Sequence, residues 1–241
     1  MKNVKRHVLI VGGSSDIGIE VVKSFLNLNW NVSAHYSKSN KKLKILKQKS
    51  KNLKLIQFNF LNYNSSRIEY LIKKKFNNKC DSIVNLIGYI DNKSFKNTNL
   101  KSVLKSLTIN ALIPILINKL LVQKMLKQKF GRILNCSSIG VKFGGGSQTY
   151  NYTLAKHCLE FIPAVYKEWA KKNVLINNLR IGITNTKIHK RIKNKNMKKR
   201  INLIPIKRMA EPKEISNYIV NLVSDKNSYM TGQTISISGG E

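Results

Sequence analysis

The sequence predicts a single α/β domain, and three observations lead to this fold class. Segments with the composition of buried strands alternate with amphipathic helical segments, beginning with a strand at 7–11 and a helix at 17–28. Such alternation is typical of folds that place helices on a sheet. A glycine-rich turn joins these first two elements. The chain has 241 residues, enough to bury one full hydrophobic core, so we expect one domain over residues 1–241.

The other elements are expected to continue this alternation. Strands are expected at 31–36, 53–58, 81–87, 131–138, 174–179 and 234–237. Helices are expected at 39–50, 65–76, 100–127 and 150–171, with a last one beginning near Glu211. Pro114 lies inside the helix at 100–127, where it predicts a kink because proline lacks an N–H and crowds the preceding turn.

The chain is strongly basic, with 44 lysines and arginines against 11 acidic residues and a net charge of +33. A field of this size would attract polyanions such as nucleic acid, acidic proteins or phosphorylated ligands. The joint abundance of Lys, Asn and Ile is also what an AT-rich genome would produce. Because the basic residues are spread from end to end and no nucleic-acid module interrupts them, we favour composition and do not expect a nucleic-acid partner.

Cysteine usage and hydropathy predict a cytoplasmic protein. Cys80, Cys136 and Cys158 are too few and too scattered for a disulfide framework or a zinc site, so no metal is expected. The longest apolar stretch, at 109–117, is shorter than the roughly 18 residues of a spanning helix. The apolar run at 8–11 is too short for a secretory signal. We therefore expect a reduced compartment and no membrane association.

The turn after the first strand is expected to bind the pyrophosphate of a dinucleotide. A glycine pattern indicates such a site when it follows a strand and opens a helix. Glycines let the backbone approach the phosphates, and the helix N-terminus offers free N–H groups and a favourable dipole. The residues expected to contact the cofactor here are Gly12, Ser14, Ser15, Asp16, Ile17 and Gly18.

The end of the second strand favours NADPH over NAD as the cofactor. An acidic residue at this place would accept hydrogen bonds from a ribose 2′-hydroxyl and repel a 2′-phosphate. The sequence instead has Tyr36, Ser37 and Lys38, two hydroxyls and a cation that suit a 2′-phosphate. The competing interpretation is that Lys38 simply belongs to the generally basic surface.

Tyr152 and Lys156 are the candidate catalytic pair. They lie four residues apart in a helical segment and therefore share one face. A neighbouring ammonium is expected to lower the pKa of the phenol, which would then exchange a proton with a carbonyl or alcohol oxygen. The same spacing occurs at Tyr70/Lys74 and Tyr89/Lys93, so it is not diagnostic alone. The pair at 152/156 also has companions, since a strand ending in Ser138 lies upstream and Asn110 lies in the helix before that strand.

These features together resemble the short-chain dehydrogenase/reductase family over nearly the whole chain. The resemblance implies a Rossmann-type, doubly wound parallel sheet of about seven strands with helices on both faces. It also implies the catalytic set Asn110, Ser138, Tyr152 and Lys156. In that set Ser138 would hold the substrate oxygen, Lys156 would also bind the nicotinamide ribose, and Asn110 would hold a water that relays protons. The further cofactor contacts implied are Asn59, Phe60, Asn85, Gly88, Tyr152, Lys156, Gly182, Ile183 and Thr186.

The match to the family's motifs is incomplete. Asn85-Leu86-Ile87-Gly88 is similar to the family's Asn-Asn-Ala-Gly but keeps only the first Asn and the Gly. Val11 and Asp16 depart from the family's Thr-Gly-x-x-x-Gly-x-Gly turn, which Gly12 and Gly18 otherwise match. Asn59 stands where the family usually has Asp. Ile181 replaces the proline of a Pro-Gly-x-x-x-Thr segment, which weakens the rigidity expected there.

The expected function is that of an NADPH-dependent carbonyl reductase acting on a 3-oxoacyl thioester of acyl carrier protein. The pattern is most similar to the fatty-acid ketoreductases. We expect the acidic carrier to dock near Lys129, Lys171 and Lys172, and the basic lid at 189–200 to favour an acidic or phosphate-bearing substrate. The resemblance implies a homo-oligomer, a dimer or tetramer. The alternatives are another oxidoreductase of the family acting on a sugar, polyol or other small alcohol or ketone, and a basic nucleic-acid-binding protein on the same scaffold.

Overall fold

The computed structural model describes residues 5–38, 41–62, 65–77, 80–192 and 196–241. Its centre is one parallel sheet of seven strands in the order β3-β2-β1-β4-β5-β6-β7, which confirms the predicted fold class. The strands are β1 (His7–Val11), β2 (Asn31–Tyr36), β3 (Leu53–Gln57), β4 (Ser82–Asn85), β5 (Gly131–Ser138), β6 (Val174–Ile181) and β7 (Thr234–Ile237). Because the order reverses between β1 and β4, a crevice is expected where the carboxyl ends of these two strands separate.

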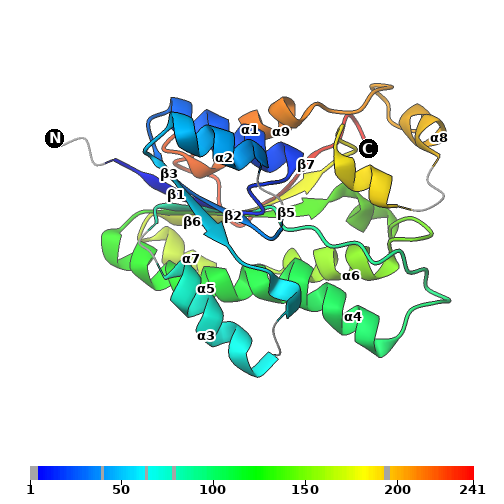
Figure 1. The fold of residues 1–241 in the computed structure, drawn as a ribbon, viewed down its shortest axis with the longest axis horizontal. Helices are drawn as coiled ribbons and strands as arrows, with labels where there is room; N and C mark the ends of the chain where they lie inside the picture. The colour runs from blue at the N-terminus through cyan, green and yellow to red at the C-terminus, as the bar shows by residue number, and fades with distance from the viewer. Residues whose placement is uncertain (1–4, 39–40, 63–64, 78–79, 193–195) are drawn as a thin grey trace.

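Helices cover both faces of the sheet (Figure 1). One face carries α1 (Asp16–Asn27), α2 (Lys41–Lys49) and α9 (Pro212–Val223). The other carries α3 (Ser65–Phe76), α4 (Leu100–Leu107), α5 (Ile113–Gln128), α6 (Tyr150–Leu159) and α7 (Tyr166–Ala170), while α8 (Met197–Asn202) lies beyond the end of the sheet.

The alternation of side chains along β1 divides the interior into two cores. Val8 and Ile10 belong to the core beneath α1 and α9, whereas Leu9 and Val11 belong to the core beneath α3 and α5. Successive side chains of a strand point to opposite faces, so a strand covered on both sides must be apolar throughout. The continuous run at 8–11 satisfies this requirement.

A buried row of asparagine side chains joins three central strands. Asn85, Asn135 and Asn178 are register partners on β4, β5 and β6. The Asn85 amide donates to Asn135 Oδ1 at 3.0 Å, and the Asn135 amide donates to Asn178 Oδ1 at 3.1 Å. Asn118 of α5 also donates to Asn135 Oδ1, at 3.0 Å. These bonds pair the amide donors, which would be costly to bury alone, while Oδ1 of Asn85 is buried without a partner in the described part of the chain.

Proline interrupts two helical stretches, at Pro114 as predicted and at Pro163 against the prediction. The helix expected at 100–127 is interrupted by a π-helical turn, Thr108–Leu112, directly before Pro114. The single helix expected at 150–171 is wrong: α6 ends at Leu159 and α7 begins at Tyr166, with Pro163 between them. Proline cannot donate to the preceding turn and clashes with the carbonyl four residues earlier, here that of Leu159.

The helical stretch Leu100–Gln128 is long and apolar enough to cross a membrane by length and composition alone. The sequence predicted no spanning helix because no uninterrupted apolar run is long enough, and Leu100–Gln128 contains polar residues between its apolar ones. Within the fold, the apolar side chains Ile113, Ile117, Leu121 and Met125 are buried in the core against the sheet. Apolar side chains on this stretch therefore serve to pack it against the sheet.

Candidate active site

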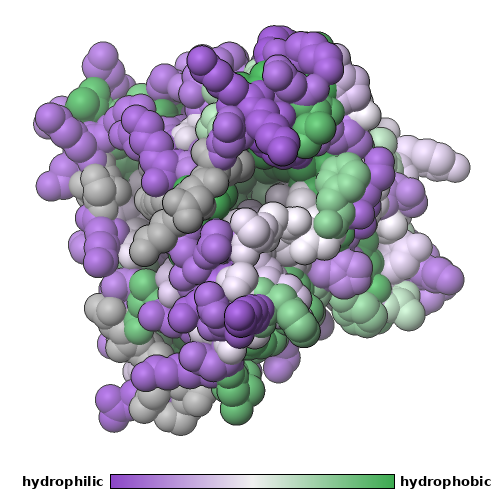
Figure 2. Space-filling view, turned by 90° about the vertical axis from the view of Figure 1, so that its right-hand side faces the viewer, coloured by the Kyte–Doolittle hydropathy of each residue, from purple (hydrophilic) through white to green (hydrophobic). Residues whose placement is uncertain are grey.

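A cavity of about 1780 Å³ opens where the strands end, and most of the predicted site residues line it. Ligand pockets commonly measure about 300–1,000 Å³, so this one has room for a dinucleotide together with a substrate. The surface at this end is visibly hollowed, with apolar and strongly hydrophilic side chains mixed around the hollow (Figure 2). The predicted residues that line the cavity are Gly12, Ser14, Ser15, Asp16, Ile17, Tyr36, Ser37, Lys38, Asn59, Phe60, Gly88, Ser138, Tyr152, Lys156, Gly182, Ile183 and Thr186.

The turn after β1 is tight and leaves its backbone close to the space where a ligand would bind. Ser15 caps α1, accepting from the Gly18 N–H at 3.0 Å and donating to the Gly12 carbonyl at 2.8 Å. A β-carbon on Gly18 would lie 2.5 Å from the Gly12 oxygen, so only glycine fits there. Gly18 does not line the cavity and acts through this packing instead. The open N-terminus of α1 and the tight glycine turn fit the pyrophosphate of a dinucleotide.

His35 supports this turn and was not foreseen from the sequence. Its imidazole is 3% exposed, and Nδ1 accepts from the Gly12 N–H at 3.1 Å. Because Nδ1 accepts, Nε2 carries the proton and donates to the Phe58 carbonyl at 2.8 Å. Burial lowers the pKa of His35 to about 4, against the opposing effect of the Phe58 hydrogen bond. The imidazole therefore stays neutral near pH 7 and holds Gly12 in place.

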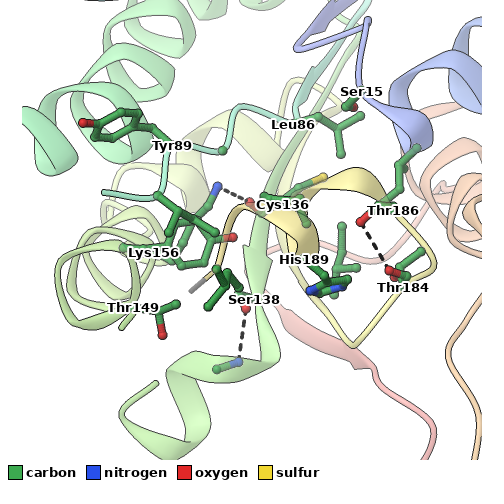
Figure 3. A pocket seen from close by; sticks show the side chains of 18 of the residues that line it. Ser15, Leu86, Tyr89, Cys136, Ser138, Thr149, Lys156, Thr184, Thr186 and His189 are labelled. Carbon is green, nitrogen blue, oxygen red and sulfur yellow. Dashed lines mark hydrogen bonds between the residues drawn. The ribbon is translucent and has the colours of Figure 1, made fainter. Parts of the chain in front are cut away.

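Lys156 is the most deeply buried cation of the site. Its side chain is 2% exposed, and its Nζ donates to the Ile87 carbonyl at 2.8 Å and to the Cys136 carbonyl at 2.7 Å. Burial lowers the pKa of Lys156 to about 8. At pH 7 the amine is thus mostly protonated, with two of its three protons given to backbone oxygens. Figure 3 shows the bond to the Cys136 carbonyl.

Tyr152 and Ser138 face the cavity beside this lysine. Ser138 ends β5, and its Oγ accepts from the Gly140 N–H at 3.2 Å. Burial raises the pKa of Tyr152 to about 12, and the neighbouring Ser138 hydroxyl only partly offsets this. The expected lowering of the phenol's pKa by Lys156 is therefore outweighed by burial in the free protein. The Lys156 Nζ lies 5.8 Å from the centre of the Tyr152 ring.

Asn110 lies behind the cavity wall instead of lining it. Its side chain accepts from the Tyr89 N–H at 2.8 Å and donates to the Tyr89 carbonyl at 2.9 Å. Its backbone belongs to the π-helical turn before Pro114, and Pro114 has no N–H to give to the Asn110 carbonyl. The kink predicted at Pro114 is thus present as this π-helical turn. The side chain fixes the segment that carries Tyr89, which does line the cavity.

Two other sets of predicted residues lie away from the cavity. Asn85 is fully buried in the asparagine row described above. Lys129 precedes β5, and Lys171 and Lys172 precede β6, so all three lie at the amino-terminal edge of the sheet. Figure 1 shows the end of α5 and α7 at the opposite side of the molecule from α8. Within one chain these lysines do not flank the cavity mouth.

The substrate side of the cavity contains side chains from the two segments expected to border it, the loop after β5 and the basic run at 189–200. Lys142 and Phe143 line it from the segment after β5, and His189 points into it from the segment after β6 (Figure 3). Lys199 of α8 also lines it. The sequence indicated these segments but not which of their side chains face the cavity, because that depends on how the segments fold over the sheet edge. Among the residues that the structure describes, no group of three His, Cys, Asp or Glu side chains could hold a metal ion.

The arrangement combines a phenol, a hydroxyl and a buried ammonium at the end of β5 with a dinucleotide-sized cleft at the β1/β4 crevice. A neutral phenol with a raised pKa retains its proton until a stronger base, such as a developing alkoxide, forms beside it. The site can therefore deliver a proton to an oxygen that is held by the two hydroxyls.

Comparisons with known proteins agree with this geometry. The family model described as enoyl-(acyl carrier protein) reductase matches residues 12–241. A 3-oxoacyl-[acyl-carrier-protein] reductase of Buchnera aphidicola subsp. Baizongia pistaciae is 28% identical over 243 residues, covering 100% of this chain and 98% of that protein. An acetoacetyl-CoA reductase of an Acinetobacter species is 31% identical over 163 residues, covering 67% of this chain and 65% of that protein.

The solved structures show the same fold. The crystal structure of a 3-oxoacyl (acyl-carrier-protein) reductase from Agrobacterium tumefaciens with NADP bound superimposes with a TM-score of 0.84. It is 20% identical in sequence, and the match covers 98% of this chain and 94% of that one. At this identity the likeness concerns the fold alone.

His35 should make stability depend on pH in the acid range. Because its folded pKa is about 4 and its ordinary value is 6.5, the unfolded chain binds the proton first as pH falls. The stability contributed by neutral His35 is complete above pH 6.5 and declines toward pH 4, by up to about 3 kcal/mol. Urea unfolding of the wild type and His35→Asn across this range should show the difference in slope. The exposed His157→Asn is the control, and an identical pH slope in wild type and His35→Asn would contradict the assignment.

Proposed function

The chain belongs to the short-chain dehydrogenase/reductase family and is an NAD(P)-dependent oxidoreductase acting on CH–OH and C=O groups, and we propose that it reduces 3-oxoacyl thioesters of acyl carrier protein with NADPH. The observation that carries the reductase assignment is the grouping of Ser138, Tyr152 and buried Lys156 at the end of β5, facing one cavity. The carrier-bound substrate is supported by the 3-oxoacyl reductase that matches the full chain.

In this proposal Tyr152 protonates the carbonyl oxygen that Ser138 holds. The reduced nicotinamide supplies the hydride. A phenol whose pKa is near 12 carries its proton at neutral pH, as a general acid must. The Ser138 hydroxyl, which lines the same cavity beside the phenol, donates to the same oxygen and keeps it in line with the tyrosine proton.

Lys156 has two roles in the proposal. Its ammonium stabilises the phenolate that remains after the proton has left, because opposite charges attract strongly in a buried site. The third Nζ proton, not used by the Ile87 and Cys136 carbonyls, is available to the nicotinamide ribose or a water. The Asn110 carbonyl, which cannot accept the usual α-helical bond because Pro114 has no N–H, would hold the water that returns a proton to Tyr152 through Lys156.

The preference for NADPH rests on the edge of the cavity at the end of β2. Tyr36, Ser37 and Lys38 line it there, and Lys41 and Lys42 of α2 join them. No carboxylate occurs between Tyr36 and Lys42 to repel a 2′-phosphate. Three ammonium groups and two hydroxyls on one rim are suited to a dianionic phosphate.

An acidic carrier protein fits the charge around the substrate side of the cavity. Lys142, Lys187 and Lys199 line this side, and Phe143 and Leu203 add exposed apolar surface. Cations around a mouth steer an acidic partner toward it. We place the docking surface here, and not at Lys129, Lys171 and Lys172, because those residues lie at the other edge of the sheet.

A second candidate substrate is a 3-oxoacyl thioester of coenzyme A. The acetoacetyl-CoA reductase at 31% identity favours it, and the same catalytic side chains would serve. The two thioesters differ in what surrounds the pantetheine arm, so the basic rim and not the reacting centre would distinguish them.

The wider proposal is a cytoplasmic homo-oligomer of single-domain chains. All seven strands join one sheet, which supports one nucleotide-binding domain over residues 1–241. The outer faces of α4 and α5 and the residues after α6 expose Leu104, Leu112, Ile115 and Phe161, apolar surface that a second copy would cover. The three cysteines are free, in keeping with a reducing compartment.

Replacing Tyr152 should abolish most turnover without removing the cofactor. Tyr152→Phe deletes only the phenolic proton donor, and loss of general-acid assistance typically costs about 10²–10⁴-fold in rate. We expect kcat to fall within that range while NADPH affinity and thermal stability stay near the wild-type values. Tyr70→Phe, at an exposed tyrosine with the same spacing to a lysine, is the matched control. Near wild-type turnover by Tyr152→Phe would remove Tyr152 from the mechanism.

A substrate panel read by NADPH absorbance tests the proposed function. It compares 3-oxoacyl thioesters on acyl carrier protein, on coenzyme A and on N-acetylcysteamine with 2-keto sugars. We expect the carrier-bound substrate to have the highest kcat/KM, and this advantage to shrink as NaCl is raised because salt screens surface charges. If no 3-oxoacyl thioester is reduced by enzyme that binds NADPH, the substrate assignment fails and the oxidoreductase assignment remains.

A further inference from the structure

Asp16 connects two walls of the cofactor cleft that are far apart in sequence. Its Oδ2 accepts from the backbone N–H of Lys187 at 2.9 Å, across 171 positions of the chain. Asp16 begins α1 beside the glycine turn, and Lys187 lies in the segment after β6. Residues of both segments line the one cavity, so this hydrogen bond joins two parts of its wall.

The segment that Asp16 contacts is anchored on its other side. The Asn185 N–H donates to the Ala210 carbonyl at 2.8 Å, and the Ala210 N–H donates to the Ile183 carbonyl at 2.9 Å. Residues 183–188 therefore form a strap, fixed at one end to the segment before α9 and at the other to Asp16. We call these residues the strap.

A second contact shows how closely the strap lies over the cleft. A β-carbon built on Gly88, which follows β4, would lie 3.2 Å from Cδ1 of Ile188. Gly88 and the turn after β1 lie on the two sides of the crevice between β1 and β4. The end of the strap thus touches both sides, through Asp16 on one and Gly88 on the other.

Neither capping nor phosphate binding explains a carboxylate at position 16. Ser15 already caps α1. A carboxylate beside the place suited to a pyrophosphate would repel that anion, so it is a poor direct ligand. Its Oδ1 lies 3.8 Å from the Lys42 Nζ, an exposed pair worth little on its own. The dipole of α1 favours a carboxylate in its first turn, and the hydrogen bond to the strap is the directed contact that this carboxylate makes.

We propose that the Asp16 carboxylate latches the strap over the bound dinucleotide and thereby slows its release. Asp16 is in this view a positioning residue that acts on the cofactor through the Lys187 N–H. The inference needs only dinucleotide binding and is independent of which ketone is reduced.

Removing either partner of the hydrogen bond tests the latch. Asp16→Ala removes the acceptor. Lys187→Pro removes the donor. Proline suits this position for two reasons: Lys187 is the first residue of its helical turn, and Thr186 before it is extended, with φ −140° and ψ 156°. Lys187→Ala keeps the N–H but loses the same ammonium, so it is the reference for Lys187→Pro.

The readout is the dissociation rate of NADPH, followed by stopped-flow fluorescence without any ketone. We expect Asp16→Ala relative to wild type, and Lys187→Pro relative to Lys187→Ala, each to release NADPH about threefold to tenfold faster. The double variant Asp16→Ala/Lys187→Pro should release it no faster than the faster single variant, because both changes break one bond.

Amide hydrogen exchange of the cofactor-free protein supplies a second readout. Exchange in the segment 183–192 should quicken in Asp16→Ala while exchange in β5 stays unchanged. An Asp16→Ala variant that releases NADPH at or below the wild-type rate, or a double variant whose effect is the product of the two single effects, overturns the latch. Unchanged exchange in the strap does the same, whatever the substrate panel shows.

Discussion

The site depends on one buried ammonium and the two carbonyls that hold it. A charged amine taken out of water is costly unless its protons find partners, and Lys156 gives two of them to the oxygens of Ile87 and Cys136. Those oxygens come from the ends of β4 and β5, so the lysine ties α6 to the sheet at the edge where the cavity opens. Tyr152, one helical turn earlier, is thereby fixed against Ser138.

The rest of the architecture places a cofactor cleft beside this group. The strand order reverses between β1 and β4, which opens a crevice next to β5. One wall of that crevice is formed by α1 with its Ser15 cap, by Gly18 packed against the Gly12 backbone, and by the buried, neutral His35. Hydrogen bonds from Ser15 and His35 hold this wall in place. The opposite wall is the strap, which hydrogen bonds tie to Ala210 through Ile183 and Asn185 and to Asp16 through Lys187.

The sequence predicted those parts of the molecule in which local chemistry decides the structure. The apolar run of β1, the glycine turn and the capped helix follow one another directly, so their pattern is visible in 20 residues of sequence. Ser138 was predicted from its place at the end of a strand, and Tyr152 and Lys156 from their spacing of one turn on the helix that follows. Both elements meet at one edge of the sheet. The break at Pro163 was also open to local analysis, but the apolar spacing of 150–171 masked it.

The parts that escaped prediction depend on contacts across the fold. His35 supports Gly12 only because β1 and β2 lie side by side, and nothing in the sequence marks it as different from another strand histidine. Burial reverses the expected direction of the Tyr152 pKa shift, and burial is a property of the assembled core. Asn85 matches the family pattern but joins a row of amides inside the sheet, and Lys129 lies at the edge far from the cavity.

The most direct test of this account is the titration of Lys156 itself. Carbon-13 NMR of the lysine Cε atoms, with Lys156→Met to assign the resonance, measures its pKa in the cofactor-free protein. We expect one lysine to titrate near pH 8, well below the ordinary 10.5, because its ammonium is buried between two carbonyls. If the resonance lost in Lys156→Met titrates with the exposed lysines, the amine is solvated and the site is not organised around it.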